Sequence, residues 1–452
     1  MRLNKETARD VLKLALPAVG EMVLYMMIWV FDTMMVGWYG GNLAVSSVGL
    51  SSEIMYTFSN VLIAVGISIG VTSLVARRIG AKETHLAEEY ATLGFCVTAI
   101  ISFILCLTTF TLSSTILTKA GANAEVVALG SPYMKITSFG IFFNMLMNSL
   151  NATLRGSGNT KIPLYASALV NVINIFLDYG LIFGKFGLPE LGVKGAALAT
   201  SIAQICGFLF ILYYTVNKAS IKIRLKYLSD FKGHMLSDLL KLSIPSSLQE
   251  GSLSISRLIC NFLIIALGTI PFAANQITTT IESISFMPGW GVAIAATTLV
   301  GHKIGEKNYA KAKEYAYTSI FIGTGLMLIC SFIFLVMPNL LISLFISSSE
   351  TEVIKLGGLC IMIAALEQPF MAVSMIAGGA LKGAGNTKTP FVVSFLSSWV
   401  IRLPLMIYFI YYLKLSVTYV WIITAVQWAF DGILVFILFR KYFKNFNLKV
   451  HN

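Results

Sequence analysis

Two aspartates stand inside stretches that are otherwise apolar, and they are the residues best suited to carry chemistry. The segment NVINIFLDYGLIFG (171–184) places Asp178 after Asn171 and Asn174, at spacings that put the three side chains on one face of a helix. A second apolar segment, WVFDTMMVG, carries Asp32 in the same way. A carboxylate near the middle of a lipid-spanning helix costs about 3 kcal/mol or more, so such residues are usually functional or internally paired.

The two acids and a threonine are expected at one depth in the membrane. Asp178 lies 17 residues beyond Lys161, which marks one end of its span, so it sits about 25 Å along the helix axis. Asp32 lies about five residues from the outer end of the first span, and Thr200 lies about 12 Å below the outer start of the sixth. Carboxylate, amide and hydroxyl oxygens suit a hard cation such as Na⁺, or a shared proton.

The elements that must position these residues are membrane-spanning helices. Of the 452 residues, 56% are hydrophobic and only 12% are charged, against about 25% charged in soluble domains. Runs of about 20 apolar residues, enough to cross the hydrocarbon, recur along the chain. The longest polar connection, 217–240, leaves no room for a soluble domain. We therefore predict an all-α integral membrane protein with twelve spans, at about 11–36, 50–76, 91–118, 130–154, 162–183, 192–216, 240–267, 275–300, 315–345, 354–381, 390–412 and 417–439.

The net charge of +12 follows the predicted topology. Of 33 basic residues, 25 fall in the two termini and in alternate loops, which by the positive-inside rule predicts that both termini are cytoplasmic. The first span has no small-residue cleavage site after a short apolar region, so we expect it to be retained. The protein is expected to be a multi-pass protein of the cell (inner or plasma) membrane, without nucleic-acid partners.

The chain is built twice. LRGSGNTKIP (154–163) and LKGAGNTKTP (381–390) agree at seven of ten positions at an offset of 227, and 74–91 resembles 299–316 at an offset of 225. Six helices in each half give two parallel repeats, whose interface is the natural place for a substrate cavity. We therefore predict an N-terminal lobe over 1–217, a cytoplasmic linker over 218–240, and a C-terminal lobe with a short cytoplasmic tail over 241–452.

Enzyme, metal and nucleotide sites find no support in the sequence. The six cysteines stand singly in apolar segments, and all four histidines lie in predicted connections. The glycine-rich loop before Lys161 lacks the Walker A order, because Thr160 precedes the lysine and Ile162 follows it. We therefore expect no catalytic residues, no metal, no cofactor and no direct use of ATP.

These motifs resemble the MATE (multidrug and toxic compound extrusion) family over essentially the whole chain. The resemblance rests on LRGSGNTKIP and LKGAGNTKTP, on LVARRIG and LVGHKIG, on VKGAALATSIAQ and on WVIRLPL. It implies two six-helix lobes in a V, alternating access, and export of organic cations coupled to inward flow of Na⁺ or H⁺. The matching residues for the coupling ion are Asp32, Asn174 and Asp178, with Thr200 as a further match. The position of the tenth-helix aspartate of NorM-type proteins is Met371 here, which favours a DinF-like mechanism in the N-terminal lobe.

The alternative role for Asn174 and Asp178 is to bridge helices, as polar groups in membranes often do. The second repeat argues for coupling. At an offset of 227 the positions equivalent to Asp178 and Asn174 are Leu405 and Ile401, whereas an acid that served only as scaffold would be expected in both halves. Four further residues are candidates for a cavity or relay role, with structural pairing as the alternative: Glu21, Asn171, Glu250 and Glu367. Two more acids are read as cavity or packing residues, and one arginine as a structural charge that pairs with a carboxylate: Glu282, Asp431 and Arg402.

Two other functions stay open at this point. A flippase for a lipid-linked precursor would share the architecture but should show a cationic cavity, whereas acids outnumber bases within the predicted spans. A membrane-embedded enzyme would need a nucleophile and base or a metal centre. We expect small organic cations as substrates, a monomer in the lipid bilayer, and aromatic and methionine side chains that could line the substrate cavity.

Overall fold

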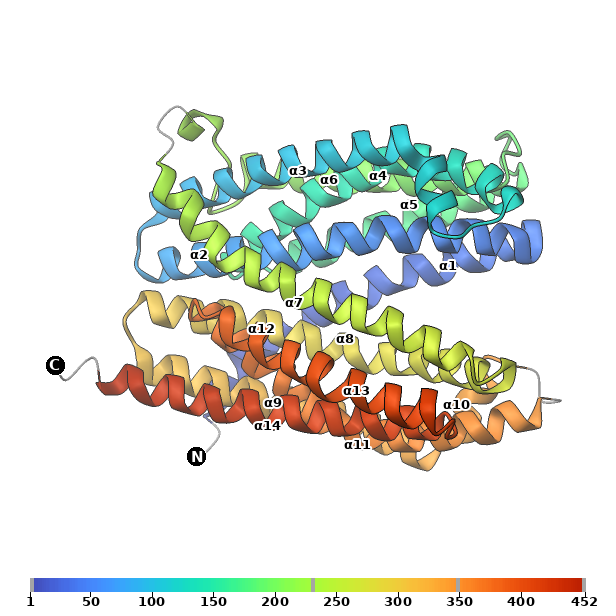
Figure 1. Cartoon of the computed structure of the whole chain (residues 1–452). Coiled ribbons are helices and arrows are strands. Elements are labelled where there is room, and N and C mark those ends of the chain that lie inside the picture. Colours follow the sequence, from blue (N-terminus) through green and yellow to red (C-terminus); the bar gives the residue numbers. More distant parts are fainter. Residues whose placement is uncertain (1–3, 229–231, 347–349, 449–452) are drawn as a thin grey trace. The chain divides into compact units, whose positions relative to one another are not determined.

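The computed structural model describes residues 4–228, 232–346 and 350–448, almost all of them helical (Figure 1). No strand occurs within these ranges. The α-helices are α1 (Lys5–Ser59), α2 (Ser68–Gly80), α3 (Thr84–Lys119), α4 (Ala124–Gly156), α5 (Lys161–Phe183), α6 (Val193–Asn217), α7 (Gly233–Ile265), α8 (Thr269–Gly305), α9 (Tyr309–Val336), α10 (Pro338–Ser343), α11 (Thr351–Gly383), α12 (Lys388–Phe395), α13 (Leu403–Met406) and α14 (Thr418–Leu448). The π-helices are η1 (Asn60–Ile67), η3 (Leu396–Arg402) and η4 (Ile407–Tyr412), and η2 (Leu225–Leu228) is a 3₁₀-helix.

The predicted multi-pass helical architecture is confirmed. In the described ranges, eleven helices are long and apolar enough to cross a membrane. The seventh predicted span, 240–267, falls on α7, a helix of 33 residues that ends at Ile265 and is not among those eleven. Its sequence, with SSLQEGS in the middle and an arginine beyond, is too polar to be recognised by hydropathy alone. The predicted span 315–345 is interrupted at Met337, because Pro338 begins the short helix α10.

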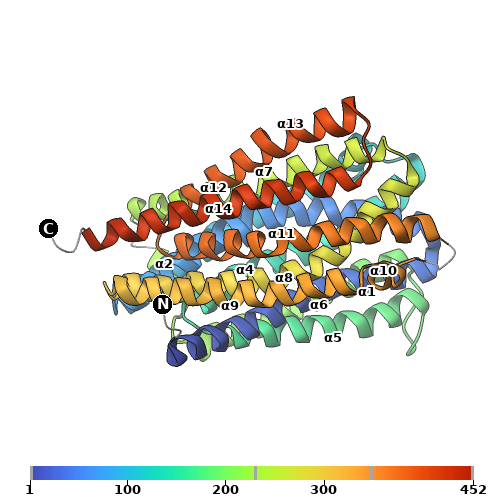
Figure 2. The same cartoon turned by 90° about the horizontal axis from the view of Figure 1, so that it is seen from below.

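The chain divides into two compact units, which we describe separately. The first unit is Gly20–Ser247, and the second combines Met1–Val19 with Leu248–Asn452. In the first unit α4 packs against α2, α3 and α6, and in the second α11 packs against α8, α9 and α14. Figure 2 shows α11 between α9 and α14. Each unit is therefore organised around its fourth predicted span.

These units and the two sequence repeats differ at two segments. The start of α1 belongs to the second unit, where Tyr315 donates a hydrogen bond of 2.5 Å to the Asp10 carboxylate. The connection after α6 and the start of α7, up to Ser247, belong to the first unit. In that connection the backbone N–H of Lys222 donates to Glu88 of α3 at 3.1 Å. Arg224 also pairs with Glu88, at 3.2 Å. The predicted lobe boundaries describe the sequence duplication, whereas the two units are defined by contacts, so those boundaries stay a prediction.

The same helix–helix contact occurs in both units, as the duplication predicts. In the second unit the Thr297 hydroxyl donates to the carbonyl of Gly379 at 2.9 Å, where α8 meets α11. In the first unit Thr72 donates to the carbonyl of Ala152 at 3.1 Å, where α2 meets α4. Threonine and small residues at such crossings allow the two backbones to approach closely. The loop motifs that repeat in sequence therefore end helices that pack alike.

Substitution of Gly379 tests this contact. A Cβ atom there would lie 2.6 Å from the Ala293 carbonyl oxygen, so the two helices would have to separate. We expect Gly379→Ala to lower the free energy of unfolding by about 1–3 kcal/mol, as overpacking does, and to lower the midpoint of thermal unfolding in detergent. The neighbouring Gly378→Ala is the control, because its Cβ would meet Pro390 at an ordinary 3.7 Å. Equal midpoints for the two variants would contradict the close approach.

Candidate functional site

Helices α1, α5 and α6 of the first unit carry the predicted ion-binding residues. Helix α5 ends at Gly184, whose left-handed backbone (φ 64°) stops the helix less than two turns after Asp178. Asn171 holds α5 against α1 by donating to the Leu24 carbonyl at 3.0 Å. Helix α6 approaches α5 closely at Gly195, where a Cβ atom would meet the backbone of Leu181. Three adjacent helices thus present their side chains to one small volume.

The structure brings together all four residues that the sequence predicts for the coupling ion. The Asn174 amide donates to the Thr200 hydroxyl at 3.3 Å, and Thr200 in turn donates to Asp32 Oδ2 at 3.1 Å. The carboxyl group of Asp178 lies within hydrogen-bonding reach of Asp32. Asp178 and Asn174 are fully buried, and Asp32 is 9% exposed. The common depth inferred from helix geometry is therefore realised as direct contact.

This cluster contains more acceptors than donors. Four buried oxygens have no hydrogen-bond donor among the described residues: Asp32 Oδ1, Asn174 Oδ1 and both carboxylate oxygens of Asp178. Two ionised carboxylates that face each other repel strongly in a medium of low dielectric constant. A positive charge between them, a proton or an oxygen-coordinated cation such as Na⁺, would supply what the protein itself does not.

Two tyrosines complete the surroundings, and sequence reasoning did not find them. Tyr133 of α4 shares a hydrogen bond of 3.0 Å with the Ser52 hydroxyl, and Tyr133 and Tyr56 lie in electrostatic range of Asp32. Both rings are buried, at 1% and 6% exposure. An aromatic residue in an apolar span carries no sequence signal that separates it from packing residues, so only the fold places these two beside the acids.

Two of the remaining candidates lie in the first unit and outside the acid pair. Glu21 forms a buried ion pair with Arg155 at 3.1 Å, which corresponds to the structural pairing considered for it. Arg155 is the arginine of the repeat LRGSGNTKIP, so this loop motif supplies a counter-charge within the unit. The Asn171 amide is occupied by the carbonyls of Leu24 and Ser167. Asn171 therefore joins α5 to α1 and does not reach the carboxylates.

The other two candidates lie in the second unit. Glu250 pairs with Arg257 at 3.3 Å near the surface of α7. Glu367 is fully buried, lies within hydrogen-bonding reach of Glu282, and feels the charge of Arg402. Arg402 donates to the Gln427 side chain at 3.4 Å and its Nε has no acceptor among the described residues, so the reading of Arg402 as a charge that pairs with a carboxylate stays a prediction. The grouping of Glu282 with Glu367 was not predicted, because the two residues stand 85 positions apart on different helices.

Asp431 is buried, and hydroxyl groups donate hydrogen bonds to its carboxylate. It accepts hydrogen bonds from Ser374 at 2.5 Å and from Ser397 at 2.7 Å, and it lies near the Lys382 ammonium group. These bonds join α14 to α11 and to η3. Asp431 therefore has fixed donors, in contrast to Asp178.

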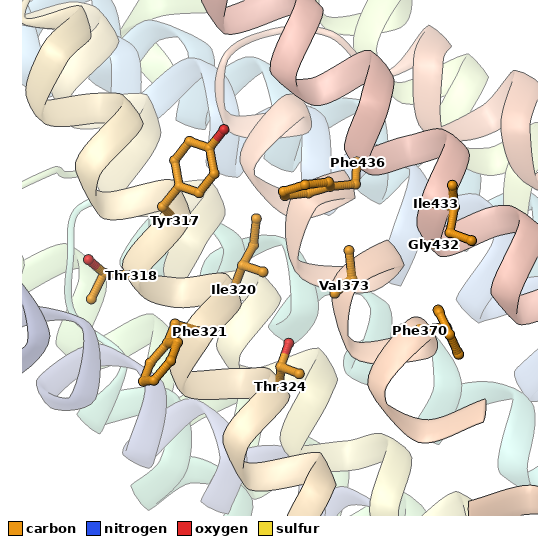
Figure 3. A pocket seen from close by; sticks show the side chains of 10 residues that line it. All are labelled: Tyr317, Thr318, Ile320, Phe321, Thr324, Phe370, Val373, Gly432, Ile433 and Phe436. Atoms are coloured by element: carbon orange, nitrogen blue, oxygen red, sulfur yellow. The ribbon is translucent and has the colours of Figure 1, made fainter. Parts of the chain in front are cut away.

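An apolar cavity of 510 Å³ lies in the second unit between α9, α11 and α14 (Figure 3). Its wall is aromatic and aliphatic, with Phe321, Phe370 and Phe436 among the lining residues. None of the predicted ion-binding residues contributes to it. The cavity has the size of a ligand pocket but no charged group that could bind an ion.

Comparison with known proteins now adds the family. The sequence model of the MatE family matches residues 17–180 and again 245–408. A probable multidrug resistance protein NorM of Thermotoga maritima is 34% identical over 448 residues, covering 97% of this chain and 91% of that protein. The multidrug resistance protein MdtK of Pectobacterium atrosepticum is 27% identical, covering 88% and 86%. A solved outward-facing multidrug resistance MATE transporter of the MOP superfamily has a TM-score of 0.90 at 23% identity, covering 99% of both chains, which shows the fold.

Removal of one acid should stabilise the protein in alkaline solution. Asn at position 178 would place an amide donor toward Asp32 and would relieve the repulsion between two carboxylates. The native protein should lose thermal stability as the pH rises, because its folded state then loses a bound proton that the pair requires. We expect Asp178→Asn to flatten this dependence and to raise the alkaline unfolding midpoint, measured by scanning fluorimetry in detergent.

Asp431→Asn is the matched control for that experiment. Asp431 already accepts from two serines, so loss of its charge should not produce the same gain in stability. If both variants respond to pH as the native protein does, the Asp32–Asp178 pair is not a site of proton or cation binding.

Proposed function

Because the chain belongs to the MatE family, whose members are transporters rather than enzymes, we propose that it exports small organic cations in exchange for H⁺ or Na⁺. The coupling ion is assigned to Asp32 and Asp178, with Asn174 and Thr200 as neutral ligands. One observation carries the assignment. Asp32 and Asp178 are buried and face each other without a basic side chain, and three of their four carboxylate oxygens have no donor among the described residues.

Three of the four other buried acids of the described ranges have fixed partners. Glu21 has Arg155, and Glu88 has Arg224 together with the Tyr227 hydroxyl. Asp431 has two serine hydroxyls. The fourth, Glu367, has no hydrogen-bond donor on either carboxylate oxygen. A fixed partner lowers the cost of burial permanently, so no exchangeable ion is needed there. The Asp32–Asp178 pair has no such partner, so its charge balance is left to an ion from solution.

Coupling requires that this ion binds with different free energy in the two orientations of the transporter. With a proton or Na⁺ bound, the two carboxylates can remain close together, and the chain from Asn174 through Thr200 to Asp32 stays intact. Without the ion, repulsion between the carboxylates favours a rearrangement of α1 relative to α5. Ion entry from outside and release inside would then drive an alternating-access cycle in which the substrate leaves the cell.

The proposed substrate class rests on the relatives and on the sign of the buried charge. The relatives named above are described as multidrug resistance proteins. Of the Asp, Glu, Lys, Arg and His residues that are buried in the described ranges, six are acids and one, Arg155, is a base. This balance suits cationic substrates. It does not suit a flippase that must hold the phosphate groups of a lipid-linked precursor.

The topology completes the proposal. The basic residues in both termini and in alternate loops support a cell-membrane location with both termini cytoplasmic, and the chain is proposed to work as a monomer. Lys161 and Lys388 would then lie on the cytoplasmic side and the Asp32–Asp178 pair in the outer half of the membrane. The coupling ion would reach the pair from the outside.

Vesicle transport tests the function directly. Inverted membrane vesicles that contain the protein should accumulate a fluorescent organic cation when a proton or Na⁺ gradient is imposed, and should not respond to ATP once both gradients are collapsed. We expect Asp32→Asn and Asp178→Asn each to reduce gradient-driven transport to the background of empty vesicles, because either variant removes one of the two charges that bind the ion.

Leu405→Ile and Met406→Leu are the controls, since both residues occupy the corresponding part of the second half and neither is an acid. They should retain transport, with protein levels matched by immunoblot. Native transport rates in Asp178→Asn vesicles under the same gradient would show that the acid is scaffold. Transport that depends on ATP and not on either gradient would rule out ion coupling.

A further inference from the structure

The apolar cavity of the second unit is a groove formed by three helices. Helices α9 and α14 both pack along α11 and make little contact with each other, and Figure 2 shows α11 between them. Helix α11 contributes Phe370 and Val373 to the floor of the groove. Helix α14 lies so close to this floor that a Cβ atom at Gly432 would be 2.5 Å from the Phe370 carbonyl oxygen. The space left between α9 and α14 is the cavity of 510 Å³.

The mouth of this groove opens on an apolar surface. Two of the lining side chains, Phe321 of α9 and Ile433 of α14, are 64% and 52% exposed. Other exposed side chains on the same two helices are also apolar, among them Leu328, Ile329 and Ile437. Both helices are long and apolar enough to cross a membrane, so an exposed apolar surface of this kind contacts the bilayer. The groove is therefore open to lipid.

Two basic residues stand one helical turn beyond one end of the groove. Figure 3 shows Tyr317 and Phe436 together at that end, and their ring centroids are 6.1 Å apart. On α9, Lys313 precedes Tyr317 by four residues, and its ammonium group lies 6.0 Å from the centre of the tyrosine ring. On α14, Arg440 follows Phe436 by four residues and therefore lies on the same face of the helix. Both bases thus extend the lining of the groove in the same direction.

The charge of these two bases is not balanced by a neighbouring acid. Among the described residues neither Lys313 nor Arg440 takes part in an ion pair, whereas Lys311 pairs with Glu314 at 3.0 Å. Glu314 is the acid next to Lys313 in the chain, and it also accepts a hydrogen bond from Thr7 of α1. Its carboxylate is therefore already engaged. The end of the groove is positively charged and would attract an anionic group.

We propose that this groove binds an anionic phospholipid, with one acyl chain between α9 and α14 and the phosphate at Lys313 and Arg440. Tyr317 and Thr324 are seven residues apart, so the wall that α9 provides extends about 10 Å along the helix axis. An acyl chain in a bilayer runs in the same direction as the spanning helices. Basic pockets between spanning helices bind anionic lipid headgroups. Two bases without an acid would repel a cationic substrate. The inference requires only that the second unit spans the membrane, and it does not depend on the proposed transport function.

Thr324 distinguishes a lipid from a polar ligand. Its hydroxyl oxygen is buried, and its side chain lines the cavity without a hydrogen-bond partner among the described residues. An acyl chain has no group that could bond to this hydroxyl, whereas a small polar molecule in the cavity would use it. Thr324→Val removes the hydroxyl and keeps the branched shape, so it should leave lipid binding unchanged.

The test measures lipid binding to purified full-length protein in detergent by native mass spectrometry. Dioleoyl phosphatidylglycerol is the anionic probe, and dioleoyl phosphatidylcholine is the probe without net charge. We expect Lys313→Gln combined with Arg440→Gln to weaken the first phosphatidylglycerol binding step by about 30-fold, because each base near a membrane surface contributes about fivefold. Phosphatidylcholine binding should not change. Lys307→Gln combined with Lys441→Gln is the control, because these exposed lysines of α9 and α14 or their flanks carry the same charge but do not adjoin the groove lining. It should have a much smaller effect.

A second pair of variants tests the acyl chain. Ile433→Trp fills the mouth of the groove and should weaken binding of both lipids. Ile329→Trp places the same ring on a 59% exposed position of α9 that does not line the cavity, and it should leave binding unchanged. If Ile433→Trp does not fold, Val373→Phe reduces the same space from the floor and replaces it.

Three results would overturn the proposal. Equal losses of phosphatidylglycerol binding in the two lysine and arginine double variants would show a general effect of surface charge. Native binding of both lipids by folded protein with a filled groove would show that no acyl chain enters it. A loss in Thr324→Val as large as that in the Lys313 and Arg440 double variant would identify the occupant as a polar molecule. Each of these readouts is independent of transport, so failure of the proposed function would leave them unchanged.

Discussion

Every charge that is buried in a membrane-spanning helix must be balanced nearby, and this constraint explains how the ionisable side chains of the protein are arranged. The protein satisfies it in two ways. Arg155 reaches Glu21 from the repeat loop, and serine hydroxyls donate to Asp431. The Asp32–Asp178 pair follows neither of them. A site that the protein leaves unbalanced is one that an ion from solution can complete, and this distinguishes the proposed coupling site from the structural acids.

Duplication has preserved the helix framework and changed the ion chemistry. The two units share a threonine-to-backbone contact at equivalent helix crossings, and in each unit the fourth span lies at the centre of the packing. At the offset of 227 given by the repeated loop, the first half has Asn174 and Asp178 where the second has Ile401 and Leu405. Packing at the crossings depends on small residues and closely spaced backbones, so only a few residue types are tolerated at those positions. It places little restriction on the polar side chains between the helices, which can diverge.

The π-helical turns of the second unit show how a small backbone change alters a site. Helix η3 spans Leu396–Arg402 and ends at the arginine itself. Because a π-helical turn contains more residues than an α-helical turn, the side chains beyond it are rotated relative to a regular helix. The position of this charge therefore depends on backbone geometry that a simple comparison of repeat offsets does not reveal.

The sequence by itself determined the class, the duplication and the acids of the first half. Apolar runs, basic loops and the LRGSGNTKIP repeat are local patterns, and helix rise alone was sufficient to place Asp32, Asp178 and Thr200 at one depth. Tertiary structure decided which polar groups have partners. Glu21 and Arg155 are 134 positions apart, and Glu282 and Glu367 are 85 positions apart, so their contacts depend on which helices are neighbours and on how each helix is rotated. Neither property is encoded in the hydropathy of a single segment, because a buried helix can turn a polar side chain toward any neighbour that balances it.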